Sequence, residues 1–253
     1  TNTTIAYIEK DNTELFRLSQ LIERGVIQDL PSFPSEAYIL TADESATAKA
    51  EFQPPWLDLA DDTSLAVGTI ARNLRSRFSE RVAISAKSWL AERSVDPRAA
   101  ILPWGTESVR VEERVSPIVV TRELLRYIRC GWDATIGAAV GAKFNDSEVV
   151  VTVPASFDEA ALALTREAVM QAGLPANTRL LEEPQAALLA WMGVDSQHQL
   201  QAHCRRAGGT RSCATGCAST SARRSSCTHA SSCTRRRRPR RGSVAADASA
   251  GAC

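Results

Sequence analysis

The sequence has 253 residues, with 30 lysine and arginine side chains against 29 aspartate and glutamate side chains, and its formal net charge is +1. That balance excludes an acidic disordered chain and, averaged over the whole length, a strongly basic nucleic-acid binder. A hydrophobic content of 44% suffices for a buried core, and the sequence holds no run of 18 apolar residues that would predict a membrane span.

The N-terminal part of the chain is expected to contain strands joined by extended links. β-Branched residues and alternation predict a strand over Thr3–Glu9, and a second strand is expected over Leu15–Ile22. An extended, proline-bounded link leads into Ala37–Leu40. The polar, proline-broken stretch Ala46–Asp62 is expected to be a surface loop.

Helices are expected in the middle of the chain. A short strand over Leu65–Gly68 is followed by a predicted helix over Ile70–Phe78 and by another over Val82–Ala91. Thr121 is a suitable N-cap for a long amphipathic helix. The apolar residues of that helix recur at helical spacing and predict its buried face: Leu124, Leu125, Ile128, Trp132 and Ile136.

The stretch from residue 148 to 192 has the pattern of a parallel α/β unit. Glu148–Val153 is a nearly continuous apolar run, as expected for a buried parallel strand. Ser156 with Glu159 matches a capping box that would begin the next helix. Arg179–Glu182 predicts another strand, and Pro184 is well placed to start the helix behind it. Strand and helix alternating with short links indicate a parallel sheet.

The C-terminal segment, residues 200–253, differs from the rest of the chain. It holds 11 arginines, no lysine, a single acidic residue (Asp247) and no aromatic residue, so its net charge is about +10. Such a composition cannot bury enough apolar surface to offset the entropy of ordering, which predicts disorder. The preceding residues carry a net charge of about −9, and Cys130 is their only cysteine, as expected in a reducing cytoplasm.

Three interpretations of the C-terminal segment compete. A zinc module is suggested by its six cysteines and His229, although their spacing is irregular and there is no core around them. A nucleic-acid-binding arm is suggested by the run Arg235–Arg241, which would neutralise phosphates. We favour a third interpretation, in which the segment is read out of frame from a point near Trp191–His203, because this composition is typical of a GC-rich gene translated in the wrong frame.

Four short stretches match one family in its order and with about its spacing. Val151–Phe157 reads V-T-V-P-A-S-F, and Arg179–Ala187 reads R-L-L-E-E-P-Q-A-A. Ala86–Lys87 and Thr1–Thr4 match a short helix and the end of a phosphate loop. Together they resemble the DnaK-type heat-shock 70 chaperones, with departures such as Leu162 that suggest a divergent bacterial type.

The resemblance implies an α/β fold, the first lobe of an actin-like ATPase whose two lobes surround a nucleotide cleft. Residues 1–195 would form this partial nucleotide-binding domain, followed by the disordered segment 200–253. The chain would then be a truncated fragment of an ATP-dependent chaperone. The parent would be an ATPase that uses ATP and Mg²⁺. The fragment, without the second phosphate loop and the second lobe, would be inactive.

The resemblance also implies roles for individual residues. Lys87 would lie by the γ-phosphate, where a cation stabilises the transferring phosphoryl group, and Glu183 would orient water on Mg²⁺ without a direct metal bond. Thr1 and Asn2 would touch phosphate, and Pro154 would relay the nucleotide state to the substrate domain. The simpler alternatives are a solvated lysine, a first-turn helix charge and a strand-ending proline.

The partners implied by the resemblance are unfolded protein clients and co-chaperones, in the cytoplasm and without a membrane. Nucleic acid would bind only adventitiously, through the arginine-rich segment. Two other functions stay open at this point. One is phosphoryl transfer to a small molecule by another actin-like protein, such as a sugar kinase, and the other is nucleic-acid binding through the C-terminal arginines.

Overall fold

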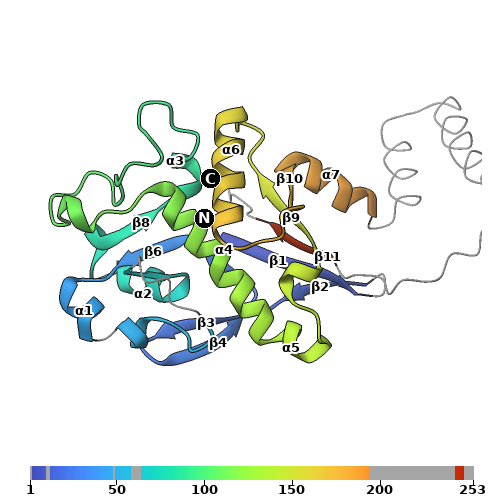
Figure 1. Cartoon of the computed structure of the whole chain (residues 1–253), viewed down its shortest axis with the longest axis horizontal. Coiled ribbons are helices and arrows are strands. Elements are labelled where there is room, and N and C mark those ends of the chain that lie inside the picture. The colour runs from blue at the N-terminus through green and yellow to red at the C-terminus, as the bar shows by residue number, and fades with distance from the viewer. Residues whose placement is uncertain (1, 10–11, 48, 58–63, 194–242, 248–253) are drawn as a thin grey trace, which may run out of the picture. The chain divides into compact units, whose positions relative to one another are not determined.

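The computed structural model describes residues 2–9, 12–47, 49–57, 64–193 and 243–247 (Figure 1). The chain divides into two compact units. The first comprises Thr1–Glu183 with Arg241–Cys253, and the second comprises Pro184–Arg240. The strands and the candidate site lie in the first unit, and each unit is considered by itself.

The main sheet of the first unit is mixed, in the order β10-β9-β11-β1-β2, with β5 paired to one end of β1. β9 and β10 run parallel, as predicted, and their bounds are those expected from the sequence. β1 runs antiparallel to β2 and to β5. The bounds are β1 (Asn2–Glu9), β2 (Asn12–Phe16), β5 (Phe33–Pro34), β9 (Glu148–Val153), β10 (Arg179–Glu182) and β11 (Ser243–Asp247).

β11 differs from the prediction of disorder over the C-terminal segment. Ser243–Asp247 is a strand between β1 and β9, antiparallel to the first and parallel to the second. Because β11 is paired on both sides, its backbone N–H and C=O groups have hydrogen-bond partners in β1 and β9. The composition of the segment does not reveal these partners. The remainder of residues 200–253, with its cysteines, His229 and Arg235–Arg241, lies outside the described residues, and so do the three interpretations of it.

Two smaller sheets complete the first unit. β3 (Leu18–Glu23) and β4 (Val26–Leu30) form an antiparallel hairpin. β6 (Glu36–Ile39) lies between β7 (Leu65–Val67) and β8 (Val82–Ile84), antiparallel to both. Beside them lie α1 (Ala42–Thr47), α2 (Thr69–Arg75) and the short 3-10 helices η1 (Lys49–Phe52) and η2 (Ser79–Arg81).

Three local predictions were wrong in this region. The strand expected over Leu15–Ile22 is broken at Arg17, where β2 ends and the separate hairpin begins. The helix expected over Val82–Ala91 begins as strand β8, because β6 offers an edge to pair with, and α3 covers only Ala86–Trp89. The loop expected over Ala46–Asp62 contains η1, whose Phe52 is buried against Tyr38.

The long helix α4 (Pro117–Ala134) crosses the face of the main sheet and packs against α6 (Glu159–Gln171) (Figure 1). It begins one turn earlier than predicted, because the N-cap is Ser116, whose hydroxyl accepts a hydrogen bond from the backbone N–H of Val119. The remaining helices are α5 (Ile136–Val140), α7 (Glu183–Gly193), η3 (Val111–Glu113) and η4 (Phe144–Asp146).

The two candidate N-caps of α4 can be separated by substitution. We expect Ser116→Ala to lower the free energy of unfolding by about 1 kcal/mol, because the orphan N–H at the helix start loses its acceptor. Thr121→Ala, the matched change at the position predicted from sequence, should stay within about 0.5 kcal/mol. Chemical denaturation measures both. Equal losses would show that Ser116 does not cap the helix.

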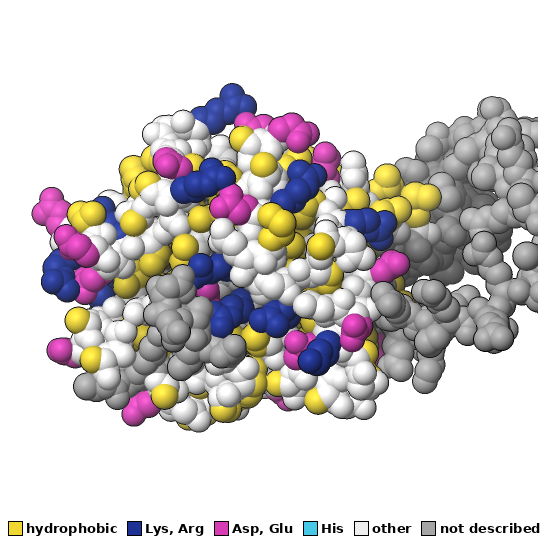
Figure 2. All heavy atoms as spheres, in the orientation of Figure 1, with side chains coloured by type: hydrophobic (Ala, Val, Ile, Leu, Met, Phe, Trp, Pro, Cys, Tyr) yellow, Lys and Arg dark blue, Asp and Glu magenta, His cyan; other side chains and the backbone are white. Residues whose placement is uncertain are grey.

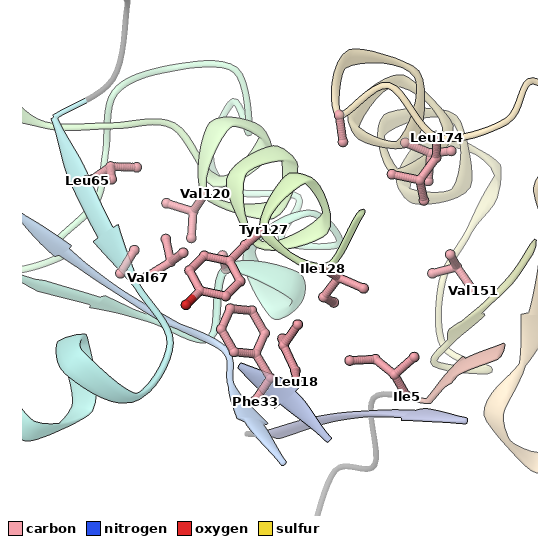
Figure 3. Packing of buried hydrophobic residues seen from close by; sticks show 14 of the residues in the cluster. Ile5, Leu18, Phe33, Leu65, Val67, Val120, Tyr127, Ile128, Val151 and Leu174 are labelled. Carbon is pink, nitrogen blue, oxygen red and sulfur yellow. The ribbon is translucent and has the colours of Figure 1, made fainter. Parts of the chain in front are cut away.

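The core lies between α4 and the sheets (Figure 3). Tyr127 of α4 stacks on Phe33 with ring centroids 4.9 Å apart. Its hydroxyl accepts a hydrogen bond from the backbone N–H of Leu21 and donates one to the carbonyl of Ser19. Burial raises the pKa of Tyr127, so this phenol stays neutral and pins the hairpin to the helix. Among the described helices, none has the length and apolarity needed to cross a membrane.

Candidate functional site

The candidate site begins at the carboxyl ends of β9 and β10. The parallel register pairs Glu182 with Val153, so that Pro154 and Glu183 follow the two strands directly at the same edge. In open α/β sheets, ligands bind beyond the carboxyl ends of the strands. The sheet therefore places Glu183 and Pro154 where a ligand would be expected.

Lys87 reaches this edge from a different part of the chain. Its ammonium donates a hydrogen bond to Oε1 of Glu183 at 2.6 Å and to the backbone carbonyl of Thr152 at 3.2 Å. Helix α3 starts after Ser85, which has a positive φ of 57°. This left-handed residue turns the chain from β8 into α3, which carries Lys87.

The pair remains accessible to a ligand. The side chains of Lys87 and Glu183 are 27% and 23% exposed, so they are neither sealed in the core nor fully solvated. A fixed ammonium next to a carboxylate offers a donor for phosphate oxygens and an oxygen that suits Mg²⁺ through water. Across the described residues, no group of three or more His, Cys, Asp or Glu is arranged to hold a metal ion.

Asn2 belongs to a different contact network, and Thr1 lies outside the described residues. The guanidinium of Arg72 donates a hydrogen bond to Oδ1 of Asn2 at 2.5 Å and another to Oε1 of Glu36 at 2.9 Å. Glu36 is only 3% exposed, and Arg75 lies 3.1 Å from its other oxygen. These three residues were missed by the sequence reasoning. The acidic residue that begins strand 36–39, ahead of three apolar residues, was the available signal that a cation partner was needed.

Pro154 lies at the start of the link between β9 and α6. Its carbonyl accepts a hydrogen bond from the N–H of Phe157, which closes the turn. The capping box predicted at Ser156 was wrong, because Asp158 is the N-cap of α6 and accepts from the N–H of Ala161 at 3.0 Å. The carboxylate binds the orphan N–H groups more strongly than a hydroxyl would.

The N-cap of α6 should make stability depend on pH. The Ala161 N–H and then the Arg93 guanidinium lower the pKa of Asp158 below 3.8. A lowered folded-state pKa contributes stability that is present above the unfolded pKa and is lost as the pH falls through the folded pKa. We expect an NMR titration to place the Asp158 midpoint below 3.8.

The matched substitution is Asp158→Asn, which keeps a capping side chain and removes its charge. The variant should be less stable than the wild type at pH 7, and this difference should vanish toward pH 2. Glu159→Gln, one residue along, is the control. A stability difference that does not depend on pH would contradict the prediction.

Charges elsewhere on the surface are mixed rather than gathered. Figure 2 shows lysine and arginine interspersed with aspartate and glutamate on the face that it displays. A cavity of about 670 Å³ lies by β6 and η3, and neither Lys87 nor Glu183 lines it. Its charged residues include Arg110, which is hydrogen-bonded to Glu113 and lowers the pKa of that carboxyl. The cavity is therefore separate from the Lys87 site.

Comparisons with known proteins agree with these motifs. The family model described as Hsp70 protein matches residues 67–204. The "Chaperone protein HscA homolog" of Photobacterium profundum is 32% identical over 145 residues, which are 53% of this chain and 22% of the relative. The "Heat shock 70 kDa protein BIP3" of Oryza sativa is 30% identical over 154 residues, which are 54% of this chain and 22% of the relative. The match thus spans about a fifth of each relative.

Proposed function

Because this chain belongs to the Hsp70 family, we propose that it carries part of the nucleotide-binding domain of an ATP-dependent molecular chaperone. The family has the actin-like ATPase fold, and the matched region is part of the N-terminal nucleotide-binding region. The family match also favours a chaperone over a sugar kinase or a nucleic-acid-binding protein.

The observation that carries the proposal is the contact between Lys87 and Glu183. These residues are 96 positions apart in the sequence. Nζ of Lys87 lies 2.6 Å from Oε1 of Glu183, at the carboxyl ends of β9 and β10. Lys87 and Glu183 are also the two residues for which the resemblance implies roles at the phosphate and at Mg²⁺. In this proposal the Lys87 ammonium neutralises charge on the γ-phosphoryl group of ATP in the whole chaperone.

Mg²⁺ fits the same residues. Glu183 would hold it through water, since a carboxylate oxygen suits this hard cation, and the bound ion would neutralise phosphate charge. The carbonyl of Thr152 and the carboxylate of Glu183 hold the Lys87 ammonium at the strand edge. Asn2, held by Arg72, is proposed to touch phosphate, as is Thr1.

The remaining roles extend to the whole protein. Pro154, in the turn that joins β9 to α6, is proposed to relay the nucleotide state to a substrate domain. Unfolded clients and co-chaperones are the proposed partners, and the cytoplasm is the proposed compartment. The single buried free cysteine of the described residues, Cys130, suits a reducing environment.

The proposal is tested by titrating the full chain with Mg·ATP and following backbone amides by NMR. We expect weak binding, with a Kd of roughly 1 mM or above, because only about a fifth of each relative is matched and the ligand would be contacted incompletely. Shifts should concentrate at Lys87, Thr152 and Glu183. Tight micromolar binding would overturn the partial-site proposal. Saturating ATP without shifts at these residues would overturn the site.

A further inference from the structure

Ser85, the residue between β8 and α3, has an unusual backbone conformation. Its φ and ψ are 57° and 31°, in the left-handed region that residues other than glycine, asparagine and aspartate rarely adopt. Among the described residues other than glycine, it alone has a positive φ. A strained residue of this kind persists only where the surrounding structure holds it, and such residues cluster at functional sites.

The side chain of Ser85 does not act as a helix cap. Serine is a preferred N-cap residue, but an N-cap has an extended backbone and its side chain accepts a hydrogen bond from the first turn. Ser85 has neither feature, because its backbone is left-handed and its side chain makes no capping hydrogen bond. Its carbonyl accepts from the N–H groups of Ser88 and Trp89 at 2.9 and 3.3 Å. The contribution of Ser85 to the start of α3 therefore lies in its backbone.

The elements on both sides of Ser85 are anchored to the fold (Figure 1). On one side, β8 is paired with β6, where Ile84 lies opposite Glu36. On the other side, α3 is held by Ala86 at its start and by Leu90 just beyond its end, and each of these side chains is 2% exposed. Because both elements are held, the backbone of the single residue between them sets the direction in which α3 leaves the strand.

The direction of α3 matters because of Lys87, two residues after Ser85. The Lys87 ammonium lies 2.6 Å from Oε1 of Glu183 and 3.2 Å from the carbonyl of Thr152. These acceptors belong to different segments, since Thr152 lies in β9 and Glu183 directly follows β10. Meeting both acceptors at once leaves the side chain little freedom, so a displacement of α3 by about 1 Å would break one contact or both.

We propose that Ser85 is a positioning residue, whose left-handed backbone directs α3 so that the Lys87 ammonium reaches Glu183 and Thr152. The position selects residues by their tolerance of the left-handed region, so glycine and asparagine suit it and β-branched residues do not. The hydroxyl has no part in this role. The catalytic consequence rests on the proposed function of Lys87, whereas the placement of the ammonium can be measured without nucleotide.

Substitution in the full chain tests the placement of Lys87. Ser85→Thr keeps the hydroxyl and adds a methyl group that disfavours the left-handed region, and Ser88→Thr makes the same change at an exposed position of α3. NMR of the Lys87 ammonium measures the exchange of its protons with solvent. We expect exchange to be roughly tenfold faster or more in Ser85→Thr, because hydrogen bonds to a charged group are lost. It should stay within about twofold of the wild type in Ser88→Thr.

Ser85→Gly keeps the proposal falsifiable if Ser85→Thr does not fold. Glycine adopts the left-handed region without strain, so ammonium exchange at Lys87 should stay within about threefold of the wild type. Such a result would also show that the hydroxyl is not needed. Fast exchange in Ser85→Gly, or wild-type exchange in a folded Ser85→Thr, would overturn the proposal.

Addition of Mg·ATP separates this proposal from the proposed function. Nucleotide should shift the Lys87 ammonium signal in the wild type and in Ser85→Gly, and should shift it less in Ser85→Thr. Equal shifts in the wild type and in a folded Ser85→Thr would overturn the positioning role. A wild type whose Lys87 signal is protected but does not shift with Mg·ATP would overturn the proposed function, and the exchange rates would still decide the role of Ser85.

Discussion

Replacing Gly68 with alanine should lower the free energy of unfolding by about 3 kcal/mol or more, from two additive causes. Gly68 has φ +85° and ψ −138°, a conformation that residues with a Cβ rarely adopt. A Cβ built on it would also lie 2.2 Å from Cε2 of Phe33. Phe33 is fully buried and stacked on Tyr127, so its ring cannot yield without disturbing the core.

The effect of Gly68→Ala would spread beyond one contact. The N–H of Gly68 donates to the carbonyl of Glu36, and its own carbonyl accepts from the N–H of Arg72 at the start of α2. Glu36 and Arg72 are also joined through their side chains, because the Arg72 guanidinium donates a hydrogen bond to the Glu36 carboxylate. A shift of this turn would therefore disturb the contacts between β6 and α2. It would also move Arg72, whose guanidinium binds Asn2.

The matched control is Gly25→Ala. Gly25 also has a positive φ, +72°, but a Cβ there would meet nothing within 4 Å. It should cost about 1 kcal/mol from backbone strain alone. Denaturant titrations of both variants separate strain from the clash with Phe33. A loss at Gly68 no larger than that at Gly25 would refute the proposed close contact.

The parts of the fold that could be predicted from sequence are those with strong local signals. β9 and β10 are bounded by charged and turn residues around apolar runs, and their predicted bounds and parallel pairing are confirmed. Val82–Ile84 was misassigned because a short apolar run suits a helix or a strand equally. The edge of β6 decides between them, and that edge exists only in the folded chain.

The N-caps and β11 show the same limit at a finer scale. Ser116 and Thr121 are both good caps by type, and only the folded start of α4 at Pro117 distinguishes them. Ser243–Asp247 has no local strand signal beyond Val244. Its structure comes from two partner strands that lie more than 90 residues away in the sequence. Composition indicates only how much apolar surface a segment can bury by itself. It does not reveal the backbone hydrogen bonds that β1 and β9 offer to β11.

The candidate site likewise has residues that the sequence predicts and contacts that only the folded chain reveals. Motifs identified Lys87 and Glu183 individually, and the structure brings them into contact. The Thr152 carbonyl and the Arg72–Glu36 pair could not be found from motifs, because a backbone acceptor has no residue type to recognise and an ion pair across 36 positions depends on the fold. Their supporting roles thus follow from geometry alone.

Replacing Lys87 with alanine should reduce ATP hydrolysis by roughly 10²–10³-fold in a whole chaperone that contains this region. A suitable protein is a chimera in which residues 67–193 replace the matching segment of the Photobacterium profundum relative. The loss follows if the ammonium stabilises charge that develops on the transferring phosphoryl group, since alanine supplies neither charge nor donor. Steady-state phosphate release measures it, and Lys143→Ala, at an exposed lysine, is the matched control.

Stability decides between this role and a structural ion pair. The Lys87 and Glu183 side chains are each about a quarter exposed, so water can replace the partner and Lys87→Ala should cost less than about 1 kcal/mol in unfolding free energy. Glu183→Gln should likewise lower turnover with little change in stability, whereas Glu182→Gln, at the exposed neighbour, should change neither. A rate within threefold of the unsubstituted chimera for both Lys87→Ala and Glu183→Gln would make the pair structural. A large loss of rate without a loss of stability would place both side chains in phosphoryl transfer.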